Sequence, residues 1–220
     1  MTRPSRNIDQ LLIDAARELL PEIGARDLSI RRLTERAGVN LGMFHYHFKT
    51  RENFLSIVLQ GMYEEMFSQL TFQAHADRPA LENLRAAVNV LGSFVRDNRH
   101  LLLRLMPDAM AGEPIARQFF RTNFPRHLGV MAQLVGEAQR AGVLRELPLF
   151  QAMSFIGGAV AMPIMMATAV QAEGVAPAAS TANLNEDVLS DRAIAQRVDM
   201  ALKGLQAESE ISDDSIRRTT

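Results

Sequence analysis

One short segment near the N-terminus gathers basic, amide, imidazole and phenol side chains whose chemistry suits contact with nucleic acid. Arg31 and Asn40 can hydrogen-bond to base edges, whereas Leu41 and Met43 can only pack on thymine methyl groups. Gly42 carries no side chain, which lets the backbone approach a duplex closely. This mixture predicts recognition through methyl contacts and DNA shape more than through paired hydrogen bonds.

Two short helices with a turn between them are the elements that would position these side chains. Ser29 opens the first helix, and Gly38 permits the turn that ends it. Asn40 caps a second helix that extends through His47. In a helix-turn-helix motif, the second helix lies in the major groove of DNA. The residues of the second helix that this pattern leaves at least partly outward are Leu41, Gly42, Met43, His45, Tyr46 and His47.

The apolar spacing predicts helices along the rest of the chain as well, so the expected fold class is all-α. Apolar residues from Ile8 to Ile23 recur on one helical face, with Asn7 as the expected cap. Gly24 supplies the left-handed residue that stops this helix. Further helices are expected at 51–72, 80–97, 99–108, 113–140, 148–172 and 187–205.

Prolines and polar stretches set the expected breaks in this helical plan. Pro125 and Pro163 lie inside predicted helices and should kink or split them. Residues 173–186 are small and polar, and they predict a flexible loop. The expected organisation is a three-helix, helix-turn-helix DNA-binding domain at 1–51, a helical ligand-binding and dimerisation domain at 52–205, and a disordered tail at 206–220.

The run AGVNLGMFHYHFKTRENFL resembles the signature of the TetR family of one-component regulators. That signature has an Ala-Gly-Val turn, a glycine at the start of the recognition helix, an aromatic core, and then a basic residue with a small cap. The length of the chain and its all-helical plan are similar too. The resemblance implies a homodimeric transcriptional repressor, released from a palindromic operator in double-stranded DNA by a small-molecule effector.

The resemblance also implies roles for single residues. Arg31 matches a groove- or phosphate-contacting position in the first helix of the motif, and the stretch from Asn40 to Met43 matches the base-facing start of the recognition helix. His45 stands where the family usually has tyrosine, so its phosphate contact has a shorter reach and is expected to weaken as pH rises. The residues that match the phosphate-facing end and the basic clamp are Tyr46, His47, Lys49 and Arg51.

The two histidines of this segment have other interpretations. His45 and His47 are two residues apart on a helix and point in nearly opposite directions, which argues against a shared metal ion. His47 is equally compatible with a place in the core and with a DNA contact. Arg36 is expected on a solvated face.

A pocket for a hydrophobic or aromatic compound is expected among the middle helices, because twelve methionines and many phenylalanines offer an adaptable apolar lining. Arg104 lies among leucines and demands an anionic partner if it is buried, or else extends to the surface. The candidate ligand-binding residues are His100, Arg104, Met106, Phe120, Asn123, His127, Met131, Phe155, Met162 and Met166.

The helices at 148–172 and 187–205 are the expected homodimer interface. The first is uncharged, and it contains Gly157 and Gly158, which allow close helix approach. Its length and apolarity also fit a membrane span, but its polar residues and the lack of a flanking basic cluster favour a buried interface helix without membrane contact. The second carries one apolar stripe, made of Ile194, Val198, Ala201, Leu202 and Leu205.

Charge and composition exclude several classes of protein. The first 51 residues carry nine Lys or Arg against six Asp or Glu, so this part is net basic while the remainder is net acidic. There is no cysteine, which removes disulfides and thiolate metal sites and fits a cytoplasmic protein. No phosphate-binding glycine loop, HExxH or GxSxG motif occurs. We therefore expect no enzyme, no cofactor and no metal, with a DNA-binding dimer that lacks ligand control as the alternative function.

Overall fold

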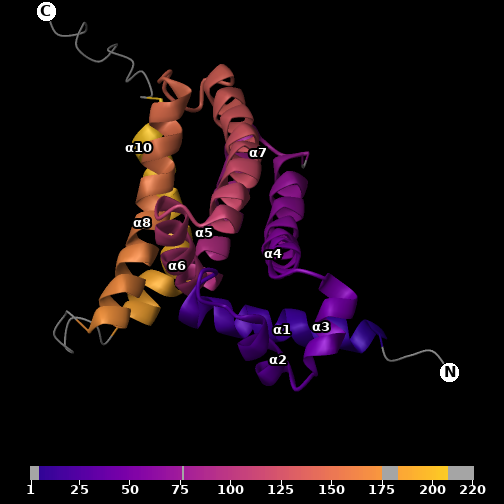
Figure 1. Ribbon diagram of the computed structural model, residues 1–220. Coiled ribbons are helices and arrows are strands. Elements are labelled where there is room, and N and C mark those ends of the chain that lie inside the picture. Colours follow the sequence, from indigo (N-terminus) through magenta and orange to yellow (C-terminus); the bar gives the residue numbers. More distant parts are fainter. Residues whose placement is uncertain (1–4, 76, 175–182, 208–220) are drawn as a thin grey trace, which may run out of the picture.

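Helices account for almost all of the part of the chain that the computed structural model describes, which is residues 5–75, 77–174 and 183–207 (Figure 1). Within these ranges the only extended pairing is a single bridge between Leu144 and Gln206. The all-α prediction is therefore confirmed. The helices are α1 Ser5–Ile23, α2 Ile30–Ala37, α3 Leu41–Phe48, α4 Arg51–Ala74, α5 Ala80–Asp97, α6 Arg99–Met110, α7 Pro114–Arg140, α8 Leu149–Glu173, a π-helical turn Asn185–Leu189, and α10 Asp191–Leu205.

Side-chain caps start the short helices where the sequence predicts them. The Ser29 side chain accepts a hydrogen bond from the Arg32 N–H, and Thr50 does the same for the Asn53 N–H at the start of α4. Gly24 ends α1 with a φ of +77°, a left-handed conformation that glycine adopts without strain. The predicted cap at Asn7 is wrong, because α1 already begins at Ser5.

The long body helices run through their prolines. α7 is continuous across Pro125 and α8 across Pro163, so neither helix is split. Proline removes one backbone hydrogen bond, and packing against neighbouring helices offsets that loss. The predicted loop at 173–186 and the predicted tail at 206–220 fall largely outside the described residues, which leave out 175–182 and 208–220.

Two hydrophobic clusters organise the molecule. The body cluster joins α4, α5, α7, α8 and α10 around side chains such as Leu134, Ile156 and Val198. The head cluster lies among α1, α2 and α3, but it also takes Phe54 from α4 and Leu105 from α6. In Figure 1 the head lies across the lower end of the upright body helices. The domain boundary after residue 51 stays a prediction, and apolar packing is continuous across it.

α8 has one face inside the body and one face outside it. Ile156, Val160 and Ile164 are buried, whereas about half of the Met162 and Met166 side chains is exposed. By length and apolarity α8 is the one helix of the described residues that passes the criteria for a membrane span. The other face of α8 packs against α5, α7 and α10.

Candidate nucleic-acid interface

A tight turn positions α3 beside α2. α2 ends at Gly38, whose φ of +66° is left-handed, and the Val39 N–H donates to the Thr34 carbonyl at 3.0 Å. The Asn40 Oδ1 then accepts a hydrogen bond from the Met43 N–H at 3.0 Å. This cap satisfies an otherwise unpaired amide at the start of α3. The turn and the cap together fix the direction in which α3 leaves the head.

α3 has a buried face and an exposed face. Phe44 and Phe48 are buried. Each of their rings packs edge-on against the ring of Phe54, and the two rings are tilted relative to each other. On the opposite face, Leu41 is 51% exposed and Tyr46 is 76% exposed. Exposed apolar and aromatic groups on so short a helix are typical of a contact surface. The residues of this exposed recognition face are Leu41, Gly42, His45, Tyr46 and Lys49.

The basic and imidazole groups next to this face differ in their exposure and in their hydrogen-bond partners. Arg31 is almost fully exposed and its Nε donates to Glu35 at 2.8 Å, a bond that raises the pKa of the guanidinium further. The His45 Nδ1 lies 3.1 Å from the Lys49 carbonyl oxygen. Because a carbonyl only accepts, Nδ1 must carry the proton, and the neutral ring then leaves Nε2 as an acceptor. His45 can therefore donate to a phosphate through Nε2 only when it is protonated.

Lys49 holds an uncommon backbone conformation. Its φ of +65° is the only positive φ at a non-glycine residue among the described residues. With a ψ of −58° this backbone lies outside the left-handed helical region; such a conformation costs of order 1–3 kcal/mol and is kept where the surrounding structure demands it. Here the Lys49 N–H donates to the His45 carbonyl and closes α3, so the exposed lysine follows directly after the recognition face.

Two predicted contact residues are turned into the head. The imidazole of His47 is only 7% exposed, its Nδ1 lies 2.5 Å from Asp9 Oδ1, and its Nε2 is shielded from solvent. The Arg51 Nε donates to the Leu28 carbonyl at 2.6 Å, and Nη2 donates to the carbonyls of Ala25 and Arg26. In this arrangement neither side chain is presented to a bound duplex. Of the two interpretations of His47, a place in the core and a DNA contact, its position matches the place in the core.

The predicted ligand-binding residues do not share one cavity. His100, Arg104 and Met106 are exposed on α6, so Arg104 lies at the surface as one of its two interpretations expected. Met131 is buried in the body cluster. Phe155, Met162 and Met166 lie on the open face of α8, which places them outside any cavity of a single chain. Of the remaining three, Asn123 and His127 lie on α7 where it contacts Tyr63 of α4, and Phe120 packs against the head cluster.

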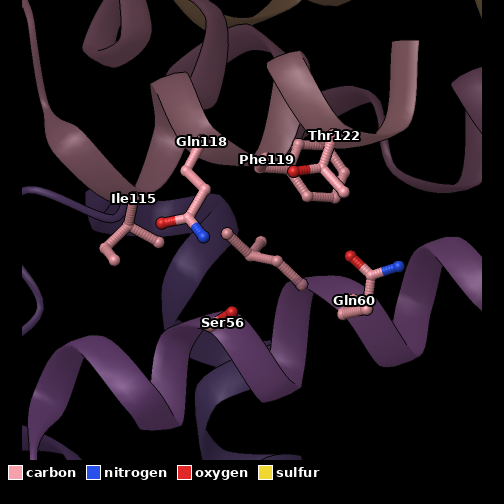
Figure 2. Close-up of a pocket in the computed structure, with 7 residues that line it drawn as sticks. Ser56, Gln60, Ile115, Gln118, Phe119 and Thr122 are labelled. Carbon is pink, nitrogen blue, oxygen red and sulfur yellow. The ribbon is translucent and has the colours of Figure 1, made fainter. Parts of the chain in front are cut away.

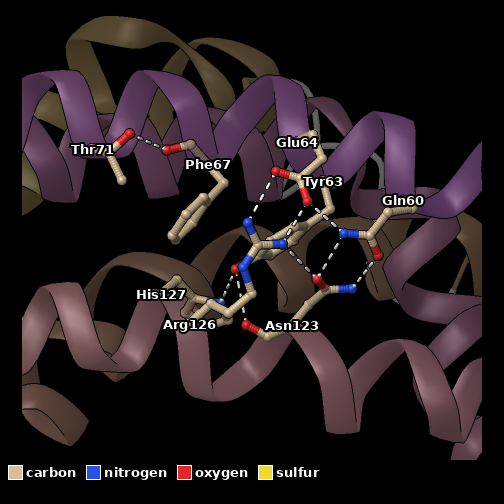
Figure 3. Close-up of polar contacts among 8 residues, drawn as sticks. All are labelled: Gln60, Tyr63, Glu64, Phe67, Thr71, Asn123, Arg126 and His127. Carbon is tan, nitrogen blue, oxygen red and sulfur yellow. Dashed lines mark hydrogen bonds and ion pairs between the residues drawn. The ribbon is translucent and has the colours of Figure 1, made fainter.

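A polar cluster, buried at Tyr63 and Asn123 and half-buried elsewhere, joins the middle of α4 to α7 (Figure 3). Asn123 is 1% exposed and exchanges amide hydrogen bonds with Gln60 at 3.0 and 3.2 Å. The Tyr63 hydroxyl donates to the Asn123 carbonyl at 2.9 Å. The Arg126 guanidinium donates to both carboxylate oxygens of Glu64 and lies over the Phe67 ring. We call Gln60, Tyr63, Glu64, Asn123, Arg126 and His127 the α4–α7 polar cluster.

The pKa values in this cluster are shifted by burial and by charge. Burial raises the pKa of the Tyr63 hydroxyl and lowers the pKa of the His127 imidazole. Hydrogen bonds from Arg126 and Gln60 hold the pKa of the Glu64 carboxyl below its usual range. At neutral pH the cluster therefore pairs a carboxylate with a guanidinium beside a neutral imidazole.

A small cleft of about 110 Å³ opens next to this cluster between α4 and α7 (Figure 2). Drug-sized ligands occupy cavities of roughly 300–1,000 Å³, so the cleft as it stands admits only a small molecule. Its mixed lining offers four hydrogen-bonding side chains beside apolar walls. The lining residues are Ser56, Leu59, Gln60, Ile115, Gln118, Phe119 and Thr122.

The α4 half of the cluster was not predicted from the sequence, although a signal was present. Polar residues at 60, 63 and 64 recur at i, i+3 and i+4 within an otherwise amphipathic helix. Residues 123, 126 and 127 repeat the same spacing on α7. Side chains at this spacing share one helical face, so each triplet predicts a polar patch, and matching patches predict a contact.

Comparisons with known proteins give the same assignment for the head. Residues 12–56 match the bacterial regulatory proteins of the tetR family. A segment of 83 residues is 28% identical to the HTH-type transcriptional regulator BetI of Escherichia coli, and it covers 38% of this chain and 43% of BetI. The chain thus spans less than half of the length of these curated relatives.

Solved structures resemble the whole molecule in fold. The ketosteroid transcriptional regulator KstR2 of Mycobacterium tuberculosis has a TM-score of 0.69 at 15% identity, over 94% of this chain and 98% of that one. The transcriptional regulator FadR of Bacillus subtilis in complex with stearoyl-CoA has a TM-score of 0.61 at 19% identity, over 83% and 98%. The N-terminal segment of this chain is thus similar to the tetR family of bacterial regulatory proteins, and the whole chain shares the fold of solved transcriptional regulators.

Proposed function

We propose that this chain is a cytoplasmic transcriptional repressor that reads duplex DNA with α3. The observation that carries the proposal is the exposed recognition face, which presents Leu41, Tyr46 and Lys49 to solvent while Phe44 and Phe48 anchor the same helix in the core. A short helix anchored on one side and open on the other suits insertion into the major groove. The tetR-family match of this segment supports the same function.

The proposed DNA contacts divide into two groups. Leu41 and Met43 pack on thymine methyl groups, and Gly42 allows the backbone to come close to the base edges. Arg31 and Asn40 supply the polar readout at the start of the motif. The residues proposed to contact phosphates are His45, Tyr46 and Lys49, whereas Arg51 and His47 support the head from within.

The proposed assembly is a homodimer through the open face of α8. Single recognition helices offer few contacts, and two-fold pairing doubles them on a palindromic operator. The predicted stripe of α10 is not the contact surface, because Ile194, Val198 and Leu202 are buried in the same chain. The outer side of α10 still contributes Met200, which is 70% exposed.

The proposed effector is a small, mostly apolar compound that binds between α4 and α7. The cleft and the α4–α7 polar cluster are adjacent to the helix that enters the head, so a ligand that separates α4 from α7 changes the position of α4. The solved complex of FadR with stearoyl-CoA supports a ligand-controlled regulator. The small volume of the cleft favours the alternative, a DNA-binding dimer without ligand control.

Selection of bound sequences from random duplexes tests the function directly. We expect a palindrome whose half-sites are separated by about one helical turn or a multiple of it. Failure to enrich any sequence at low salt would overturn the proposal. A rise in melting temperature with small apolar molecules would separate the ligand-controlled regulator from the alternative.

The phosphate contacts are tested by the salt dependence of binding. Replacing Lys49 by Ala should weaken binding to all duplexes and lower the slope of log K against log [salt] by about one. Arg36→Ala is the matched control, because Arg36 is also a head cation but pairs with Glu18 and Glu22 on α1. Equal slopes in the Lys49→Ala variant and the wild type would place Lys49 away from phosphate.

A further inference from the structure

Body side chains hold the connection between α1 and α2 from two sides. On one side, Asp108 of α6 directs its Oδ2 at this connection and accepts hydrogen bonds from the Ala25 N–H at 3.1 Å and the Arg26 N–H at 3.3 Å. On the other side, Arg51 at the start of α4 donates to the carbonyls of Ala25, Arg26 and Leu28. The amides of the connection are thus bonded to a carboxylate and its carbonyls to a guanidinium.

Gly24 is the residue that allows α6 to come this close. A Cβ built at Gly24 would lie 2.9 Å from the Asp108 Oδ2 and 3.5 Å from the Arg104 Cβ. The φ of +77° at this position disfavours any other residue as well. The close approach and the positive φ thus both require glycine at position 24, directly before the Ala25 and Arg26 amides that Asp108 binds.

The same part of α6 is also attached to the head by apolar packing. Leu101 and Leu105 are buried in the head cluster together with side chains of α1. Asp108 lies one turn beyond Leu105, so the helix that packs under α1 also carries the carboxylate. A displacement of α6 therefore acts on the α1–α2 connection through both contacts.

We propose that Asp108 is a positioning residue that sets how the reading helices α2 and α3 sit relative to the body. The inference rests on the proposed DNA-binding function. Hydrogen bonds from backbone N–H groups to a carboxylate are stronger than bonds between neutral groups, and here two of them converge on one oxygen. Because α2 begins at Ile30, only a few residues after Arg26, the bound segment determines where the helix-turn-helix starts.

Amide hydrogen exchange in the full-length protein tests the clamp without DNA. In Asp108→Ala, the Ala25 and Arg26 amides should exchange roughly tenfold faster or more, while amides in α7 keep their wild-type rates. Asp108→Asn should lie between, because its amide oxygen still accepts but carries no charge. Asp97→Asn is the matched control, since Asp97 is an acid of the body that pairs with Arg96 and does not contact the connection. Unchanged exchange of both amides in Asp108→Ala would overturn the clamp.

Operator binding tests the positioning role. Asp108→Ala should weaken operator binding by roughly tenfold with an unchanged salt slope, because the phosphate contacts remain while their placement is lost. Full affinity together with released amides would overturn the positioning role. A wild-type protein that binds no duplex would overturn the proposed function, and the exchange measurement would still decide whether the clamp exists.

Discussion

At the scale of single residues, α3 shows how one short helix serves the core and a partner at once. Phe44 and Phe48 face inward, four residues apart, and Leu41 and His45 face outward with the same spacing. The 3.6-residue period of the helix makes this division readable from the sequence. The orientation of His47 was not readable, because its pairing depends on Asp9 of another helix.

Gly42 offers a test of close backbone approach. Gly42→Ala should gain less helix stability than the roughly 1 kcal/mol of an open site, because its Cβ presses on the Asn40 cap oxygen, and it should reduce operator affinity about tenfold or more, because the added methyl group occupies space proposed for the duplex. Equilibrium unfolding and a fluorescence binding titration measure the two effects. In the protein alone, the new Cβ would meet only Asn40 Oδ1, at 3.3 Å.

The control for this change is Gly61→Ala in the exposed part of α4, where a Cβ meets nothing within 4 Å. It should give the full gain in helix stability of about 1 kcal/mol and leave operator affinity as it is. Full operator affinity in Gly42→Ala would show that the backbone does not approach the bases closely at this point.

At the scale of helices, the contact between α4 and α7 is the polar part of an otherwise apolar body. Gln60 and Asn123 satisfy one another, and Glu64 and Arg126 form an ion pair beside them. Buried polar groups are tolerated when they are fully bonded, and they specify one alignment of two helices more sharply than apolar groups do. The cluster therefore fixes the register of α4, the helix that leads into the head.

His127 makes this contact sensitive to acid. Burial lowers its pKa, so the folded protein keeps the imidazole neutral while the unfolded chain binds a proton below about pH 6.5. The unfolded state then holds more protons, and the free energy of unfolding falls as pH decreases from that value toward the lowered pKa. Between about pH 7.5 and about pH 5, the free energy of unfolding from denaturant melts should fall less in His127→Phe than in the wild type.

Phe124→Leu serves as the control for His127→Phe. The Phe124 ring lies 4.9 Å from the His127 ring between centroids, so the change disturbs the same contact without removing a titratable group. Its acid-induced loss should equal that of the wild type. If His127→Phe loses as much stability as the wild type on acidification, another group is responsible.

At the scale of the whole molecule, the head and the body are mechanically joined. The head cluster contains Phe54 and Leu105, which belong to helices of the body. Asp108 and Arg51 add polar contacts at the α1–α2 connection. A ligand that changes the body can therefore reach the recognition face through packed elements with no flexible linker between them.

The open face of α8 predicts the behaviour of the assembly. Met162→Glu should shift the protein from dimer to monomer in sedimentation and weaken operator binding, because the two-fold axis brings two new carboxylates near one another in an apolar contact. The monomer itself should fold normally, since the Met162 side chain is already 55% exposed. If Met162→Glu dimerises with the same affinity as the wild type, the interface lies on another surface.

Phe72→Glu is the matched control for this prediction. Phe72 is a large apolar residue near the end of α4 that is 73% exposed and lies away from α8. Its replacement should leave both the sedimentation of the dimer and the affinity for the operator as in the wild type.

By itself, the sequence determined the helical elements and the chemistry of the reading segment. Caps at Ser29, Asn40 and Thr50 and the stop at Gly24 are local effects, so they were predicted from neighbouring residues alone. The recognition face followed from the helical period of α3, and the resemblance to the TetR family came from the run of residues around it.

Only the tertiary structure decided which predicted residues meet. Met162 and Met166 were expected inside a pocket and lie on an open face, and the α10 stripe was expected between chains and fills the core of one chain. A helical period shows that two residues share a face, but it does not show what covers that face. That depends on contacts between segments far apart in the chain, such as Asp108 with Ala25, which no local pattern encodes.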